Sequence, residues 1–139
     1  MKRLKVVPVI VGILVDSFGS IAVALVYFAA VLGVELARGG ELTEQTLAPH
    51  VPITAVFGLV LTGIGGFIAG RLAMTDEVYH GIAVGIGSVL IWLLLDWVSP
   101  SEAAWSLVET LSFIAVIPVA ALGGYAAARM NRRTLGPGE

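Results

Sequence analysis

The sequence predicts an all-α integral membrane protein folded as a four-helix bundle, and three observations lead to that prediction. Of its 139 residues, 58% are hydrophobic and 13% are charged, and the mean hydropathy is +0.96. Soluble domains carry about 25% charged residues, so a soluble fold of this composition would lack the polar side chains needed to cover its surface. The apolar residues form four long runs separated by short polar segments. Each run is long enough to cross the ~30 Å hydrocarbon core of a bilayer as a helix.

The first predicted helix covers about residues 6–36. Its start, Met1-Lys2-Arg3-Leu4-Lys5, resembles the positive end of a signal peptide, but the apolar run continues to Val34. The apolar part of a signal peptide has only about 7–15 residues, so we expect this segment to remain as a membrane helix. A pair of glycines then ends the helix, and a polar, acidic loop follows.

The second predicted helix covers about residues 53–72, and the third covers about 77–98 after a short link. Asp76 precedes the third helix, where its carboxylate can cap the helix by accepting backbone N–H groups.

The fourth predicted helix covers about residues 100–129. Ser99-Pro100-Ser101-Glu102 carries its start signal, with serine at the cap, proline at the first helical position and glutamate three residues after the cap. Pro118 inside this helix removes a backbone hydrogen bond and predicts a kink. The sequence therefore predicts one transmembrane domain over residues 1–130, followed by a disordered cytoplasmic tail over 131–139.

The distribution of basic residues predicts the orientation. Of the 8 lysine and arginine residues, all except Arg38 lie on one side of the predicted membrane: Lys2, Arg3, Lys5, Arg71, Arg129, Arg132 and Arg133. Basic residues accumulate on the cytoplasmic side of membrane proteins. We therefore expect a multi-pass protein of the inner (plasma) membrane with both termini in the cytoplasm.

The chain contains no cysteine, which excludes disulfides, thiol catalysis and cysteine-ligated metals. Its two histidines, His50 and His80, fall on opposite sides of the predicted membrane and cannot share a metal ion. The sequence also contains no set of nucleophile and base, no phosphate-binding loop and no basic patch for nucleic acid. We therefore expect no enzymatic activity, no cofactor, no metal site and no nucleic-acid partner.

Small residues recur every four positions on each predicted helix, so they share one face. Such faces let membrane helices approach closely and gain dispersion contacts. The residues predicted to pack in this way are Gly12 and Ser20, then Gly58, Thr62, Gly66 and Gly70, then Gly81 and Gly85, and finally Gly124. Besides packing the bundle, these faces leave open a homo-oligomer or a contact with another membrane protein.

Two of the runs end in related motifs, Gly65-Gly66 to Arg71 and Gly123-Gly124 to Arg129. They leave open two parallel two-helix repeats. Arginine at the edge of a membrane binds lipid phosphates, so Arg71 and Arg129 are predicted to anchor the helices to lipid.

Asp16 is the ionisable residue predicted to lie deepest in the membrane, about 15 Å from the start of its helix. A carboxyl group at this depth faces protein or water rather than lipid. Asp16 could relay a proton or cation, with Asp96 and Glu109 on the path from outside. It could instead be a protonated structural group, hydrogen-bonded to Ser20, Thr62 or a backbone carbonyl. His80 has two interpretations. It could pair with a carboxylate and sense pH, or it could cap a neighbouring helix end.

The segment Gly65-Gly66-Phe67-Ile68-Ala69-Gly70-Arg71, followed by His80-Gly81-Ile82-Ala83-Val84-Gly85, contains the patterns GG-x-x-AG-R and HG-x-x-x-G. In these it resembles small four-helix membrane protein families of bacteria and archaea that have no assigned function. The resemblance implies the four-helix topology and no activity. Small multidrug resistance transporters also have a membrane-embedded carboxylate in their first helix, where Asp16 lies, although theirs is a glutamate.

The sequence therefore favours a non-enzymatic membrane protein with a structural or accessory role. The alternative is a small proton-coupled transporter or channel that uses Asp16.

Overall fold

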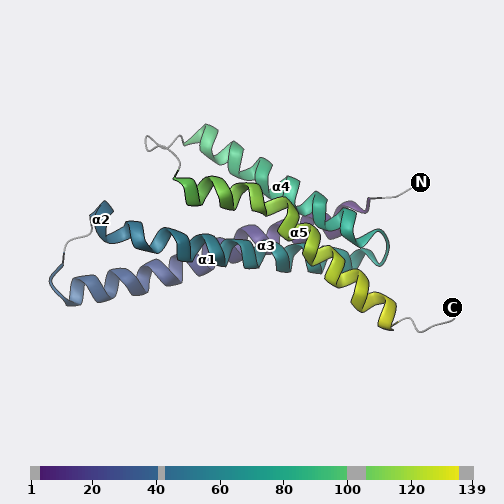
Figure 1. The fold of residues 1–139 in the computed structure, drawn as a ribbon, viewed down its shortest axis with the longest axis horizontal. Helices are drawn as coiled ribbons and strands as arrows, with labels where there is room; N and C mark the ends of the chain where they lie inside the picture. The colour runs from purple at the N-terminus through teal and green to yellow at the C-terminus, as the bar shows by residue number, and fades with distance from the viewer. Residues whose placement is uncertain (1–3, 41–42, 100–105, 135–139) are drawn as a thin grey trace.

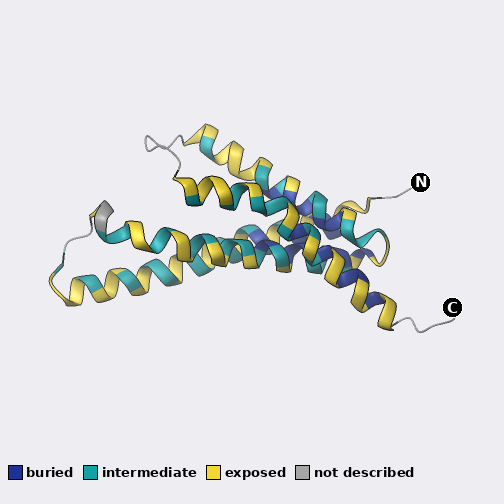
Figure 2. Ribbon diagram, viewed as in Figure 1, coloured by how far each residue is buried: buried dark blue, intermediate teal, exposed yellow. Residues whose placement is uncertain are grey.

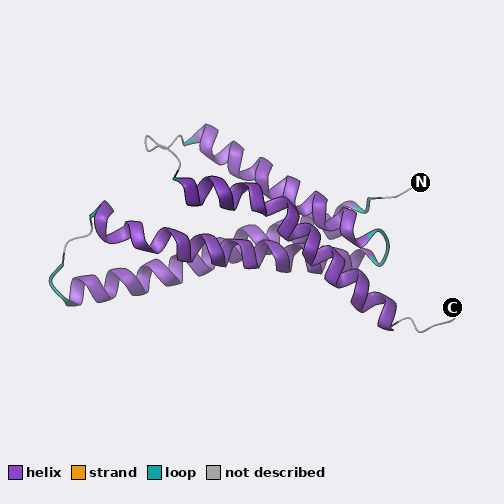
Figure 3. Cartoon of the chain, viewed as in Figure 1, coloured by secondary structure: helices purple, strands orange, loops and turns teal. Residues whose placement is uncertain are grey.

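The computed structural model describes residues 4–40, 43–99 and 106–134, which form helices in this order: α1 (Val6–Ala37), α2 (Glu44–Leu47), the 3-10 helix η1 (Ala48–His50), α3 (Val51–Ala73), α4 (Glu77–Val98) and α5 (Leu107–Thr134) (Figure 1). These described residues contain no strand (Figure 3). The 4 long helices are each long and apolar enough to cross a membrane. The predicted all-α, four-helix membrane architecture is confirmed.

The helix boundaries agree closely with those predicted, except in α5. The predicted start near Pro100 lies outside the described residues, and the described helix begins at Leu107. At the other end, α5 continues to Thr134, so the predicted tail begins with helix rather than disorder. The buried side chain of Asn131, bonded to both α3 and α4, explains why this last turn is retained. Pro118 lies inside α5, which bends midway along its length (Figure 1).

The four long helices converge at one end of the bundle and diverge at the other (Figure 1). We call the end that carries both chain termini and the α3–α4 link the terminus end. The opposite end, which carries the α1–α3 and α4–α5 connections, is the loop end. Helix α3 contacts each of the other three long helices. The buried residues gather toward the terminus end (Figure 2), so this half of the bundle holds the core.

The core consists mainly of small side chains. Its buried hydrophobic residues are Val9, Ala69, Ala73, Val84, Ala120, Ala127 and Ala128. Because these side chains are short, the helix backbones must approach closely for the core to fill.

Glycine makes that approach possible where α3 crosses α5. A Cβ atom on Gly66 would overlap the carbonyl oxygen of Ala120, and a Cβ on Gly123 would overlap that of Gly63. Gly66 and Gly123, one from each glycine motif, therefore lie in the same helix crossing. A Cβ on Gly70 would lie 2.8 Å from the Ala127 Cβ in the next turn.

The α4–α5 contact depends on glycines from both helices. A Cβ on Gly81 would overlap the Ala120 carbonyl oxygen, and one on Gly85 would lie 2.8 Å from the Cα of Ile117. From the other side, a Cβ on Gly124 would lie 2.5 Å from the Glu77 carbonyl oxygen. Larger residues at these positions would separate the helices.

A reciprocal glycine contact joins α1 and α3. A Cβ on Gly12 would lie 2.7 Å from the Gly65 carbonyl oxygen, and a Cβ on Gly65 would lie 2.6 Å from that of Gly12. The Gly65 position is also 3.2 Å from the Asp16 Cβ. This contact presses α3 against the part of α1 that carries Asp16.

Gly58 differs from the other glycines predicted to pack. A Cβ there would meet no atom within 4 Å, because Gly58 lies toward the loop end, where the helices diverge. The prediction that Gly58 packs against a neighbouring helix is therefore corrected. The face that it shares with Gly66 and Gly70 packs at those two glycines but not at Gly58. Ser20 is half-buried at a similar distance along α1.

The two glycine motifs do not have equivalent neighbours. Gly65 packs on α1 and Gly66 on α5, whereas Gly123 packs on α3 and Gly124 on α4. In two parallel repeats, corresponding glycines would face corresponding helices. The internal repeat therefore stays a prediction that these contacts do not support.

Candidate functional site

Asp16 lies where α1, α3 and α4 meet, and it is 5% exposed. Its Oδ1 atom accepts a hydrogen bond of 2.8 Å from the Thr62 hydroxyl on α3. Its Oδ2 atom accepts one of 2.5 Å from the Ser88 hydroxyl on α4. The predicted bond to Thr62 is present, and Ser88 is a partner that the sequence did not identify. The carboxyl group therefore ties three helices together.

The local sequence places these three polar side chains at the same position along the length of the bundle. Asp16 follows Gly12 by one helical turn, and Thr62 precedes Gly66 by one turn. The glycines bring the helix backbones together, so that side chains as short as threonine and serine reach the carboxylate. A larger residue at Gly12 or Gly65 would move the Thr62 hydroxyl out of range.

The Thr62 hydroxyl has two acceptors but only one proton. Besides Asp16, its Oγ1 atom lies 3.1 Å from the Gly58 carbonyl oxygen in its own helix. If the carboxyl is ionised, Thr62 and Ser88 both donate to it. If it is protonated, Asp16 donates to Thr62, which can then donate to Gly58. The same heavy-atom positions thus accommodate either protonation state of the carboxyl group.

Asp96 and Glu109 lie apart from this cluster. Asp96 is half-buried near the loop end of α4, and Glu109 is exposed in the first turn of α5. The Glu109 carboxylate accepts the Ser106 backbone N–H at 2.7 Å, while the Ser106 hydroxyl accepts the Glu109 N–H at 3.2 Å. This reciprocal pair is a capping box. No hydrogen bond among the described residues joins either acid to Asp16, and Glu109 caps a helix.

The hydrogen bonds around Asp16 form one layer of polar contacts across the bundle. His80 forms a second such layer, closer to the terminus end. Its ring is fully buried. The Nε2 atom accepts the backbone N–H of Lys5 at 2.9 Å, and Nδ1 lies 3.0 Å from the Asp76 carbonyl oxygen. Because the carbonyl can only accept, Nδ1 carries the proton. His80 therefore caps the start of α1, as one of its two interpretations predicted, and its bond to Asp76 involves the backbone rather than the carboxylate.

Lys5 strengthens the same layer from the other side. Its Nζ atom donates a hydrogen bond of 2.7 Å to the Ala73 carbonyl oxygen at the end of α3. A cation at this position also complements the partial negative charge of a helix C-terminus. The layer thus joins the start of α1, the end of α3 and the start of α4.

Asn131 lies at the centre of a third polar layer, which the sequence analysis did not predict. It is 2% exposed. Its side-chain oxygen accepts a 2.6 Å hydrogen bond from Arg71 of α3, and its nitrogen donates a 3.0 Å bond to the Glu77 carboxylate of α4. The Arg71 guanidinium group therefore holds α3 to α5, and its role as a lipid anchor stays a prediction. Asn131 continues the buried ridge through Gly124 and Ala127, which is the signal that could have identified it.

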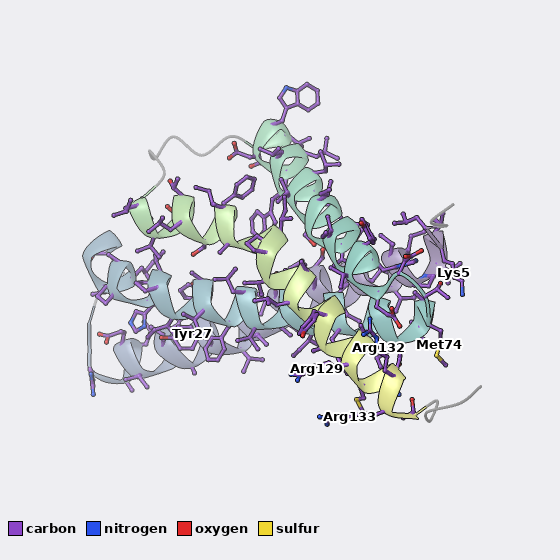
Figure 4. All side chains as sticks on the ribbon, turned by 45° about the vertical axis from the view of Figure 1, so that its right-hand side comes forward. Lys5, Tyr27, Met74, Arg129, Arg132 and Arg133 are labelled. Atoms are coloured by element: carbon purple, nitrogen blue, oxygen red, sulfur yellow. The ribbon has the colours of Figure 1, made fainter. Side chains whose placement is uncertain are left out.

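A shallow hollow of about 300 Å³ lies near the loop end between α1 and η1. Tyr27 (Figure 4) and His50 line it, with 2.7 Å between the Tyr27 hydroxyl and His50 Nδ1. Other lining residues are Ala30, Val31, Val34, Glu35 and Arg38. Glu35 and Arg38 form a loose ion pair at 3.9 Å. No group of three or more acidic or histidine side chains within the described ranges is arranged to hold a metal ion.

No protein-family model, curated protein or solved structure matches this chain. The four apolar helices define its class as a multi-pass membrane protein with a four-helix bundle.

Proposed function

We propose that this chain is a non-enzymatic protein of the inner (plasma) membrane, with both termini in the cytoplasm and a structural or accessory role. One observation carries the proposal. Each of the buried polar side chains bonds to a helix end or side chain outside its own helix: Asp16, Thr62, His80, Ser88 and Asn131. No buried side-chain polar atom in the described part of the chain lacks a partner. Polar groups used in this way hold helices in register.

The polar layers and the glycine contacts act together. Hydrogen bonds between membrane helices contribute about 0.6 kcal/mol on average and up to about 1.7 kcal/mol. Three layers of this strength do not replace packing, but they favour one alignment of the helices over others that bury the same small residues. The basic residues at the terminus end support the proposed orientation.

An accessory role requires a surface for a partner, and the loop end of α4 supports one. Each residue from Ile91 to Leu95 is exposed. These five residues make more than one helical turn, so no face of α4 packs against a neighbouring helix there. A second copy or another membrane protein could cover this surface by helix packing.

Thermal unfolding of Asp16 variants in detergent tests the structural role. Asp16→Asn keeps the size of the side chain and can still accept a hydroxyl hydrogen bond, so it should unfold close to the wild type. Asp16→Leu leaves the Ser88 hydroxyl without its acceptor and the Thr62 hydroxyl with only the Gly58 carbonyl, so it should lower stability by about 1–3 kcal/mol. If Asp16→Leu is as stable as the wild type, the three-helix tie does not stabilise the fold.

A second candidate function is a small proton-coupled transporter or channel centred on Asp16. The two acceptors of the Thr62 hydroxyl favour it, because the carboxyl can gain or lose a proton without moving its neighbours. In this case purified protein in vesicles would carry a proton flux that Asp16→Asn removes. The burial of Asp16 favours the structural role.

A further inference from the structure

The basic residues at the terminus end fall into two groups in the structure. Lys5 and Arg71 are used inside the bundle, where they bond to Ala73 and Asn131. The remaining arginines of this end that the structure describes are Arg129, Arg132 and Arg133 on α5, and all are exposed. None of these three guanidinium groups forms an ion pair or hydrogen bond with a described residue. They are available to a ligand.

Two of these arginines continue an exposed ridge of α5. Tyr125, Arg129 and Arg133 are spaced four residues apart, so their side chains share one face. Leu122 lies one turn further into the membrane on the same face. Leu122 is 65% exposed and Tyr125 is 52% exposed. The ridge therefore passes from an apolar residue through an aromatic ring to two cations, toward the end of the helix.

We propose that this ridge binds one anionic phospholipid of the adjoining leaflet. Its phosphate would lie between Arg129 and Arg133, whose side chains start about 6 Å apart along the helix. Guanidinium groups bind phosphate through paired, charge-assisted hydrogen bonds. Tyrosine prefers the boundary between headgroups and acyl chains, which is the level of Tyr125. An acyl chain would then run along Leu122.

The third arginine has a different place. Figure 4 shows Arg129 and Arg133 pointing away from the bundle, whereas Arg132 points to the other side of α5, where the α3–α4 link lies. Arg132 follows Arg129 by three residues, so its backbone lies beside the ridge, but its side chain leads away from Arg129 and Arg133. It provides a matched control, because its removal changes the net charge equally.

This proposal deepens one part of the proposed function, the membrane placement, and is independent of the structural or transport role. The test uses the full-length protein, purified in neutral detergent and titrated with phosphatidylglycerol or phosphatidylcholine. Native mass spectrometry counts the bound lipids and gives an apparent Kd. Inorganic phosphate, added as a competitor, distinguishes a lipid site from a site for the free anion.

We expect the wild type to bind one phosphatidylglycerol in preference to phosphatidylcholine. Arg129→Gln and Arg133→Gln should each weaken this binding about fivefold, and Arg132→Gln less than twofold. Inorganic phosphate should not displace the lipid. Equal binding of the two lipids, or an equal loss in Arg132→Gln, would overturn the proposal and indicate a general effect of positive charge. Displacement by phosphate would overturn the lipid as the ligand.

These arginines form no hydrogen bond or ion pair with a described residue, so far-UV circular dichroism should show unchanged helix content in all three variants. The separate charge-preserving variant Arg129→Lys should recover part of the affinity that Arg129→Gln loses. Full recovery by Arg129→Lys would mean that charge alone suffices and would overturn the paired guanidinium–phosphate contact. Proton flux through vesicles should be the same in every variant, which separates this result from the outcome for Asp16.

Discussion

Gly66→Ala tests the contact on which the bundle depends most. Gly66 lies where α3 crosses α5, and its added Cβ would lie 2.9 Å from the carbonyl carbon and 3.0 Å from the Cα of Ala120. It would lie closer still to the carbonyl oxygen. Carbon atoms pack best at about 3.5–4.0 Å, so the two backbones would have to separate by about 0.5–1 Å.

The size of the effect follows from that separation. A gap of about 0.5–1 Å removes a quarter to a half of the dispersion energy of the affected contacts. Overpacking of this kind costs about 1–3 kcal/mol, and the obstacle here is backbone that cannot rotate away. Alanine gains about 0.5–1 kcal/mol over glycine within a helix, which offsets part of the loss. We expect a net destabilisation of about 1–2 kcal/mol.

Gly58→Ala provides the control in the same helix. A Cβ at Gly58 meets no atom within 4 Å, so this variant should gain the helix preference of alanine and lose nothing. Reversible unfolding in detergent micelles, followed by far-UV circular dichroism, measures both variants. If Gly66→Ala is as stable as Gly58→Ala, the α3–α5 crossing does not depend on glycine at position 66.

Two further predictions concern the terminus end and the loop end. Asn131→Ala removes the side-chain amide that bonds to Arg71 and Glu77. It should lower the free energy of unfolding by about 1–3 kcal/mol in the same assay. An unchanged value would mean that the third polar layer does not stabilise the fold. Leu93→Cys introduces a single thiol into a chain that has no cysteine, and oxidation in native membranes should give a disulfide-linked dimer if α4 packs against a second copy. Val60→Cys on α3 is exposed to a similar extent (55% against 46%) and should remain monomeric; equal cross-linking of the two would indicate random collision.

Hydropathy predicted the four long helices because membrane spans require long apolar runs whatever their partners are. The start of α5 was harder to predict, since the chain contains the pattern S-x-x-E twice, at Ser99 and at Ser106. Both satisfy the local requirements of a capping box, and the described capping box is the second. Local chemistry alone does not decide between two competing caps.

The candidate site was predicted only in part, for reasons of three-dimensional arrangement. A buried carboxyl group at Asp16 follows from its depth and from its small neighbours. The choice of Thr62 and Ser88 as partners depends on how α3 and α4 are rotated about their axes, which the ridges on all four helices do not specify. The packing prediction for Gly58 was wrong because it assumed that the helices remain in contact along their whole length.

Polar contacts between distant segments were the least accessible to sequence reasoning. His80 and the Lys5 backbone belong to different helices, 75 residues apart, and no local pattern joins them. Asn131 follows the last apolar run, so hydropathy assigned it to a tail. Its burial reflects the continuation of the Gly124 and Ala127 face by one more turn.

We propose that the buried polar groups hold the helices together and carry no transported proton. Proton flux in vesicles, driven by a pH gradient, tests it most directly when wild type, Asp16→Asn and protein-free vesicles are compared at equal protein incorporation. We predict that wild type and Asp16→Asn give the same flux, at the level of protein-free vesicles. A wild-type flux above that level, abolished by Asp16→Asn in protein that remains folded, would contradict the claim and establish Asp16 as a proton carrier.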